Sequence, residues 1–254
     1  MNSTPLAPFA RTLQLIGPSA MERLTRARVA VVGLGAVGSY ATEALARAGI
    51  GELHLFDHDV VGESNRNRQL FALASTLGQP KAEVARRRVL DINPHCRVVA
   101  RQEFVAPQEV ARLLDPTWDA LVDAIDGVNA KVHLIAAAVH AGIPVVSSMG
   151  AAAKVDPSQI TTADLARTRV CPLAQVLRKR LRRLGIASGV RCVFSLEPPQ
   201  NTNPPLLGET AEQGVCGRPR EPLGSISYLT GIFGLMAAAE VIRILVPEVF
   251  PPRK

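Results

Sequence analysis

The stretch that decides the fold runs from residue 29 to residue 81, where VAVVGLGAVGSY (29–40), LHLFDHD (53–59), SNRNRQ (64–69) and GQPK (78–81) follow in order. The first two pieces are an apolar strand leading into a glycine-rich turn, and a second strand ending in an acid. Many dinucleotide enzymes share that combination, so it predicts a bound nucleotide and no particular reaction. The last two pieces add Arg and Lys, which an enzyme that breaks ATP needs beside the departing pyrophosphate.

Three glycines give the turn its expected geometry. Gly33 permits the tight turn out of the strand, Gly35 lets the backbone approach a phosphate, and Gly38 lets the following helix pack on the sheet. The amides at the start of that helix then face an anion. Asp57 ends the second strand, where its carboxylate can accept hydrogen bonds from both ribose hydroxyls, while Asp59 is expected to hold structure or a metal.

The loop after the second strand supplies the groups that favour ATP over a nicotinamide dinucleotide. Asn65 offers a neutral hydrogen-bonding group, and Arg68 and Lys81 offer two cations. Attack of a carboxylate on the α-phosphorus places negative charge on the non-bridging oxygens and on pyrophosphate. Arg68 and Lys81 are therefore expected to stabilise the transition state more than the ground state, which makes them candidate catalytic residues.

A further carboxylate follows a later strand, in LVDAIDG (121–127). Ligands of open α/β sheets collect at the carboxyl ends of the strands. Asp126 is a candidate catalytic residue and the candidate Mg²⁺ ligand there, directly or through water, and the bound ion would orient the phosphates. The competing interpretation is that Asp126 only caps the next helix.

The remaining sequence predicts an α/β fold with a doubly wound, mostly parallel, Rossmann-like sheet. Strand-like runs at 97–100, 120–122 and 144–147 alternate with helix-like runs at 81–92, 108–114 and 131–140. From residue 151 the alternation stops, and a C-terminal extension is expected to add strands and a basic helix. We expect a single domain over 1–254, with an ATP-binding part at 9–150 and a substrate-side part at 151–254.

The C-terminal half carries the densest positive charge, in PLAQVLRKRLRRL (172–184). Leucines and a valine form one helical stripe, and the cations occupy much of the rest. This pattern fits either a solvated helix face or a contact with RNA phosphates. The net charge of +7 fits RNA too, although 24 Arg against 5 Lys can reflect composition alone. The candidate tRNA-binding residues are Arg178, Lys179, Arg180, Arg182 and Arg183.

Two later segments and the overall composition limit the class of protein. Residues 197–220 are proline-rich and read as a mobile loop. Residues 224–239 are apolar but shorter than the ~20 residues that a membrane span requires, so they predict a core strand and a buried helix. The N-terminus lacks the apolar run of a secretory signal, which predicts a cytoplasmic protein. Four cysteines form no CxxC pair, so neither a zinc site nor a thioredoxin-like motif is encoded.

The ordered set GLGAVG, LFDHD, SNRNRQ, GQPK and DAID (123–126) resembles the adenylating domain of the ubiquitin-activating-enzyme superfamily. The resemblance covers most of residues 9–150. It implies activation of a carboxylate as an acyl-adenylate, with an arginine near the N-terminus, here Arg11, reaching the triphosphate of a neighbouring subunit. Ala36 stands where glycine is common, yet its backbone amide remains, so binding should survive. The implied ATP contacts are Gly35, Asp57, Asn65, Arg68, Lys81 and Asp126.

The C-terminal half is similar to one branch of that superfamily, which dehydrates threonylcarbamoyladenosine in tRNA. The residues that carry this are 156–185, then GVRCVFSLE (189–197) and the segment from GSISY (224–228) to residue 245. The resemblance implies ATP-dependent activation of the threonyl carboxylate, ring closure with net loss of water, and a tRNA partner for the basic helix. It favours a homodimer and leaves open whether a sulfur-relay protein docks. No cysteine lies in GSISY, so thioester catalysis is not indicated.

Three other functions remain open at this point. An adenylyltransferase for a sulfur-carrier protein would activate a protein C-terminus, although relatives of that kind usually carry paired CxxC zinc motifs. An NAD-dependent oxidoreductase would leave Arg68 and Lys81 unexplained. A noncatalytic RNA-binding protein that retains the fold is the third, because Ala36 departs from the glycine pattern.

Overall fold

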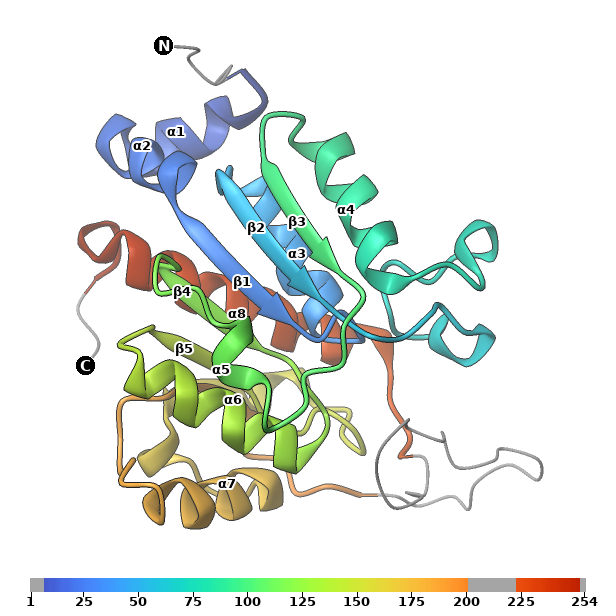
Figure 1. Ribbon diagram of the computed structural model, residues 1–254, viewed down its shortest axis with the longest axis vertical. Coiled ribbons are helices and arrows are strands. Elements are labelled where there is room, and N and C mark those ends of the chain that lie inside the picture. The colour runs from blue at the N-terminus through green and yellow to red at the C-terminus, as the bar shows by residue number, and fades with distance from the viewer. Residues whose placement is uncertain (1–6, 201–222, 252–254) are drawn as a thin grey trace.

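The computed structural model describes residues 7–200 and 223–251, in which seven strands form one sheet. The strand order is β3-β2-β1-β4-β5-β7-β6, and every neighbouring pair is parallel except β6 with β7 (Figure 1). This arrangement confirms the predicted doubly wound, mostly parallel sheet. The strands are β1 (Arg28–Val32), β2 (Glu52–Phe56), β3 (Arg97–Arg101), β4 (Ala120–Asp123), β5 (Val145–Ser148), β6 (Ile160–Asp164) and β7 (Arg191–Ser195).

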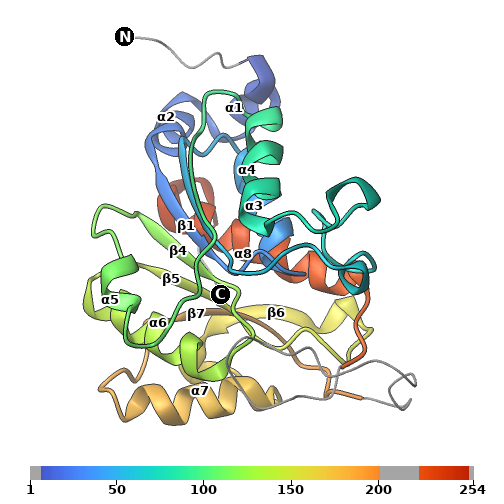
Figure 2. The same ribbon diagram turned by 45° about the vertical axis from the view of Figure 1, so that its right-hand side comes forward.

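Helices cover both faces of the sheet (Figures 1 and 2). One face carries α3, α4 and α8, and the other carries α5, α6 and α7. Two further helices, α1 and α2, precede the first strand. The helices are α1 (Ala10–Ile16), α2 (Pro18–Arg26), α3 (Gly38–Arg47), α4 (Lys81–Ile92), α5 (Val110–Leu113), α6 (Val128–His140), α7 (Pro172–Arg182) and α8 (Ser227–Leu245).

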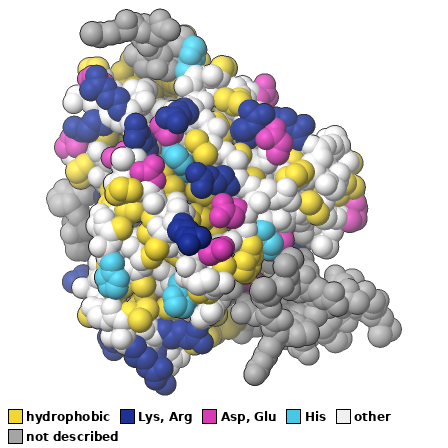
Figure 3. All heavy atoms as spheres, in the orientation of Figure 1, with side chains coloured by type: hydrophobic (Ala, Val, Ile, Leu, Met, Phe, Trp, Pro, Cys, Tyr) yellow, Lys and Arg dark blue, Asp and Glu magenta, His cyan; other side chains and the backbone are white. Residues whose placement is uncertain are grey.

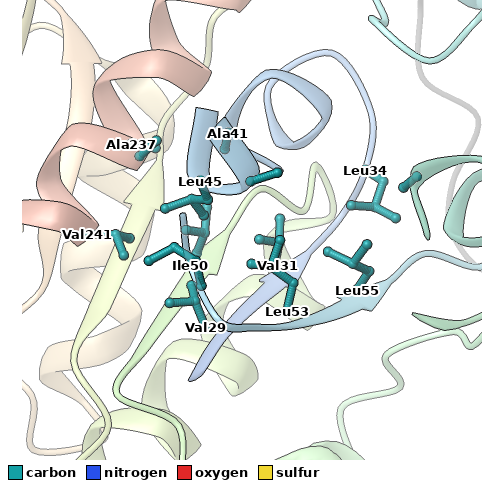
Figure 4. Close-up of a cluster of buried hydrophobic side chains, with 14 of the residues drawn as sticks. Val29, Val31, Leu34, Ala41, Leu45, Ile50, Leu53, Leu55, Ala237 and Val241 are labelled. Carbon is teal, nitrogen blue, oxygen red and sulfur yellow. The ribbon is translucent and has the colours of Figure 1, made fainter. Parts of the chain in front are cut away.

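The central strand β1 separates two cores because successive side chains point to opposite faces. Val29 and Val31 belong to the core under α3 and α8, whereas Ala30 and Val32 belong to the core under α6 and α7. Figure 4 shows the first core, in which the labelled β1 and β2 side chains lie beside those of α3 and α8. Small and branched apolar residues on β1 therefore contribute to both cores.

Helix α8 replaces the core strand and buried helix that the sequence predicted for 224–239. The helix contains Gly231 and Gly234, although glycine weakens a helix. They are needed for close packing, since a Cβ at Gly234 would lie 2.3 Å from the carbonyl oxygen of Val37 at the start of α3. By length and composition, α8 could cross a membrane, and it is the one such helix among residues 7–200 and 223–251. It packs on α3 and on the sheet.

Other sequence predictions have mixed outcomes. The helix at 81–92 is confirmed as α4, and the strands at 97–100, 120–122 and 144–147 are confirmed within about one residue. Helix α5 is shorter than predicted. The antiparallel edge strand β6 had no prediction of its own, because ITTAD does not alternate apolar and polar residues. All five of its residues are half-buried. Most of the predicted loop at 197–220 lies outside the described residues.

Candidate nucleotide-binding site

The parallel strands bring the predicted nucleotide motifs to one edge of the sheet. Val32, the last residue of β1, is paired with Phe56 on one side and with Asp123 on the other. The glycine loop, the LFDHD motif and the DAID turn therefore leave the sheet next to one another. This is the switch point at which open α/β sheets bind ligands, because the connection after β1 leads to β2 on one side, whereas the connection after β3 crosses to β4 on the other side.

The glycine loop is closely packed underneath and open on its outer side. Gly33 has φ +90, and a Cβ there would lie 2.7 Å from the carbonyl oxygen of Ala124. A Cβ on Gly38 would lie 1.7 Å from the carbonyl oxygen of Gly33. Around Gly35 the nearest such atom is in the Gln69 side chain, at 3.7 Å. Helix α3 has no side-chain N-cap, so no capping side chain competes with an anion at its N-terminus.

Asp57 is buried directly after β2, and its carboxylate ties two motifs together. The backbone amide of Leu34 donates to its Oδ2 atom at 2.7 Å, and the amide of Asp59 donates to its Oδ1 atom at 2.9 Å. A carboxylate offers about four acceptor positions. Asp57 therefore retains capacity for ribose hydroxyls while fixing the glycine loop.

Asn65 and Arg68 lie on the loop between β2 and α4. This loop contains a 3-10 turn at Glu63–Asn65. The buried Asn65 side chain accepts a hydrogen bond from Gly62 N at 3.1 Å. Arg68 is half-buried, and its Nη1 donates to Ser64 O at 2.7 Å and Asn67 Oδ1 at 2.8 Å. The amide of Leu70 donates to Ser39 Oγ on α3 at 3.1 Å. The loop is thus fastened to the helix that follows the glycines.

Lys81 begins α4 and is buried, with its side chain 7% exposed. Its ammonium donates to Asp59 Oδ2 at 3.0 Å, so Asp59 is its counter-ion. The Asp59 side chain is 48% exposed, so solvent screens this pair. The ammonium therefore lies beside the LFDHD motif, where an incoming phosphate can compete for it.

Asp126 is exposed in the turn between β4 and α6. The N-cap of α6 is Gly127, and no side chain caps it. The structure thus gives no support to the interpretation that Asp126 only caps the helix. An exposed carboxylate at the ligand edge suits Mg²⁺, which binds through one or two carboxylates together with phosphates and water. A second group of potential ligands, Asp57, His58 and Asp59, has donor atoms within 4.8 Å of one another.

A buried ion pair under this turn was missed by the sequence interpretation. Lys131 on α6 and Asp123 at the end of β4 are both fully buried, and Nζ lies 2.8 Å from Oδ2. Ser147 on β5 donates to the same oxygen at 2.6 Å. The available signal was a single lysine within the apolar helix VNAKVHLIAAAVH (128–140).

The basic helix α7 exposes four of its five candidate residues. Lys179, Arg180, Arg182 and Arg183 are exposed, and Figure 3 shows Lys and Arg side chains gathered at the lower end of the molecule, where α7 lies. Arg178 instead is half-buried, because its Nη1 donates to Thr168 O at 2.8 Å and contacts Thr168 Oγ1. Exposed Arg167 and Arg169, just before α7, extend the basic surface and were not predicted.

Arg11 lies far from the glycine loop of its own chain. It is an exposed residue of α1. Helix α2 ends at Arg26 just before β1, so the N-terminal helices pack at the amino ends of the strands, opposite the nucleotide edge (Figure 1). The contact of Arg11 with the triphosphate of a neighbouring subunit, which the resemblance implies, therefore stays a prediction.

Neither Cys96 nor Cys192 presents an activated thiol. Cys96, Cys171 and Cys192 are buried. Burial raises the pKa of Cys96 to about 12 and raises that of Cys192 as well, so both thiols stay protonated near neutral pH. Cys216 lies outside the described residues.

A glycine loop, a buried aspartate directly after the adjacent strand, and Arg68 and Lys81 on the elements beside them are the features of a Rossmann-like nucleotide-binding protein. The sequence matches the ThiF family model over residues 9–252. The chain therefore belongs to the ThiF family, which confirms the resemblance that its motifs suggested.

Individual relatives are similar along nearly the whole chain. The tRNA threonylcarbamoyladenosine dehydratase of Bacillus subtilis (strain 168) is 38% identical, covering 96% of each protein. The protein of that name from Escherichia coli (strain K12) is 39% identical, covering 92% of each. A crystal structure of E. coli tRNA N6-threonylcarbamoyladenosine dehydratase, TcdA, in complex with ATP matches with a TM-score of 0.85 and 36% identity, covering 96% of this chain and 95% of that one.

Proposed function

We propose that this chain dehydrates threonylcarbamoyladenosine in tRNA to its cyclic form, in an ATP-dependent reaction. The observation that carries the proposal is the meeting of the glycine loop, Asp57, the Arg68 loop, Lys81 and Asp126 at one edge of the sheet. Dehydratases of this name are similar to the chain over 92–96% of its length. An NAD-dependent reaction would leave the presence of Arg68 and Lys81 at this edge unexplained.

In the first step, the threonyl carboxylate attacks the α-phosphorus of ATP. A carboxylate oxygen–phosphorus bond forms, and the bond to pyrophosphate breaks. Arg68 and Lys81 stabilise the charge that grows on the phosphate oxygens and on pyrophosphate. Asp57 accepts hydrogen bonds from the ribose, and the amides around Gly35, Ala36 and Gly38 contact the phosphates. Asp126 would hold Mg²⁺, which would supply charge neutralisation and orientation of the polyphosphate.

In the second step, the substrate supplies its own nucleophile. The carbamoyl group attacks the activated carbonyl carbon, a proton is released, and AMP leaves with the carboxylate oxygen. The net change in the nucleoside is the loss of one water. Because the reacting groups belong to one molecule, closure needs orientation and no enzyme thiol. The buried, protonated thiols of Cys96 and Cys192 agree with this route.

The tRNA partner is proposed to contact α7, whose exposed cations suit a phosphate backbone. A homodimer is proposed as well, because Arg11 lies at the opposite edge from the nucleotide site of its own chain and reaches a triphosphate only across a subunit boundary. An enzyme acting on tRNA with ATP is expected in the cytoplasm.

The decisive experiment supplies ATP, Mg²⁺ and tRNA bearing threonylcarbamoyladenosine. Mass spectrometry should find a nucleoside lighter by one water, with AMP released in equal amount. tRNA lacking the modification serves as the control and should release no AMP. If no dehydrated nucleoside forms, and the enzyme instead adenylates the C-terminus of a small sulfur-carrier protein, the proposed function is wrong.

A further inference from the structure

A fully buried ion pair lies beneath the nucleotide edge, and nothing in the proposed reaction uses it directly. Lys131 comes from the first turns of α6, and Asp123 from the last position of β4. Both side chains have 0% exposure. A buried ion pair is often no more stabilising than an apolar pair of similar volume, since both charges lose their hydration. A contribution to one specific local conformation explains its presence better than stability does.

The contacts of Lys131 converge on a single turn. Besides the carboxylate of Asp123, its ammonium donates to Asp123 O at 3.4 Å and to Ile125 O at 3.1 Å. These two carbonyls belong to the stretch between the end of β4 and the start of α6. The three donors of the ammonium are thereby all directed at the turn that ends in Asp126.

Asp123 completes the same arrangement from the other side. Its Oδ1 accepts from Ile125 N at 3.2 Å, and its Oδ2 accepts from Ser147 Oγ on the neighbouring strand β5. Ile125, which immediately precedes Asp126, is therefore held at both its amide and its carbonyl. Asp126 itself is exposed and has no such burial to fix its position.

The same turn supports the glycine loop. Ala124 N donates to Val32 O at 2.9 Å, and the Ala124 carbonyl oxygen would lie 2.7 Å from a Cβ on Gly33. The Ala124 side chain would lie 3.3 Å from a Cβ on Gly38. A shift of the turn would therefore move the backbone that cradles the phosphates together with the carboxylate of Asp126.

We propose that Lys131, paired with Asp123, is a positioning residue that holds the Asp123–Asp126 turn so that Asp126 and the glycine loop meet the same Mg²⁺–ATP. The inference rests on the proposed nucleotide site. It assigns Lys131 no contact with substrate, and its effect passes through Asp126. Groups that orient a metal ligand in this way typically change activity or metal affinity by about 10–100-fold when they are removed.

The test replaces both charges, in Asp123→Asn/Lys131→Met, so that no unpaired charge stays buried. The matched control is Arg191→Met/Glu240→Gln, which removes another ion pair, with a 3.1 Å contact between β7 and α8. Thermal melting is measured for both variants, and turnover is expressed per folded protein. We expect a loss in kcat of about tenfold or more in the first variant. The control should retain wild-type kcat within experimental error.

A combination with Asp126→Asn separates positioning from general stability. If Lys131 acts through Asp126, adding Asp126→Asn to the neutral pair should cost little more than Asp126→Asn alone. Independent effects would multiply instead, and that result would overturn the inference. Wild-type kcat in the folded neutral-pair variant would overturn it too. If that variant does not fold, Ser147→Ala removes the hydrogen bond from Ser147 Oγ to Asp123 with little change in volume. The same two results, wild-type kcat or an effect independent of Asp126→Asn, would then overturn the inference.

Calorimetry of ATP binding with and without Mg²⁺ needs no tRNA, so it distinguishes this inference from the proposed function. A wild-type protein that fails to dehydrate tRNA refutes the function alone. Loss of the Mg²⁺-dependent gain in ATP affinity in the neutral-pair variant supports positioning, and its full retention refutes positioning.

Discussion

The carboxylate of Asp57 accepts a 2.7 Å hydrogen bond from the backbone amide of Leu34, which lies between the first two glycines of the loop. One side chain thus joins the end of β2 to the turn that leaves β1. The group expected to bind ribose also determines where the phosphate amides stand. Sugar recognition and phosphate recognition are therefore coupled through a single residue.

Asp57→Asn should weaken ATP binding by about 10–100-fold, because hydrogen bonds to a charged group contribute about 1.5–3 kcal/mol. Isothermal calorimetry measures the change in Kd. Asp119→Asn is the matched control, since Asp119 accepts from Arg28 N at 2.8 Å at the opposite edge of the sheet. Equal ATP affinity in wild type and Asp57→Asn would remove Asp57 from the site.

Lys81→Ala and Arg68→Ala should each lower turnover by roughly 100-fold or more, because each removes a cation that stabilises transition-state charge. Folding should be retained, since the Asp59 partner of Lys81 is half-exposed and stays hydrated. Single-turnover measurement of AMP release tests both variants. Arg87→Ala, an exposed change on the same helix as Lys81, provides the comparison. A residue whose removal leaves near-normal rates has no role in the chemistry.

Gly38→Ala should destabilise the protein by about 1–3 kcal/mol and weaken ATP binding, because the new methyl group would meet the Gly33 carbonyl oxygen at 1.7 Å. Urea unfolding gives the stability change. Gly142→Ala tests the specificity of the effect, because a Cβ there meets no atom within 4 Å, although its φ of +75 adds some backbone strain. Unaltered stability and affinity in Gly38→Ala would contradict the observed close packing.

Arg182→Glu/Arg183→Glu should weaken tRNA binding and flatten its salt dependence, with the slope of log affinity against log salt falling by about one for each lost phosphate contact. Fluorescence anisotropy over a range of salt concentrations measures this. Arg26→Glu/Arg112→Glu makes the same change in net charge at two exposed positions on other helices. If the two double variants bind tRNA with the same affinity at every salt concentration, the cations of α7 belong to a solvated helix face and do not contact tRNA.

Much of the nucleotide edge could be predicted because its signals are local. An apolar strand followed by GLGAVG, and a second strand ending in Asp57, each lie within a dozen residues. Parallel pairing then places consecutive strand ends together without further information. Helix α4 was predictable for the same reason, since its apolar residues repeat along one face. The ThiF family match over residues 9–252 agrees with these signals.

The contacts that distant segments make could not be read in this way. The pairing of Arg178 with Thr168 turns one of five similar cations inward. The close approach of α8 to Val37 and Tyr40, which leaves little room for a Cβ at Gly231 or Gly234, was not predicted. A lone lysine in an apolar helix gave no indication that Lys131 would meet Asp123 and Ser147.

By itself, the sequence determined the alternation of strands and helices up to residue 147, the class of ligand and the residues offered to ATP, because these depend on periodicity and on short motifs. Only the tertiary structure decided which charges are paired, which are exposed, and which turn holds Asp126. Those outcomes depend on burial and on distances between segments far apart in the chain. Burial makes an unpaired charge costly, and that cost brought Lys131 and Asp123 together beneath the nucleotide edge.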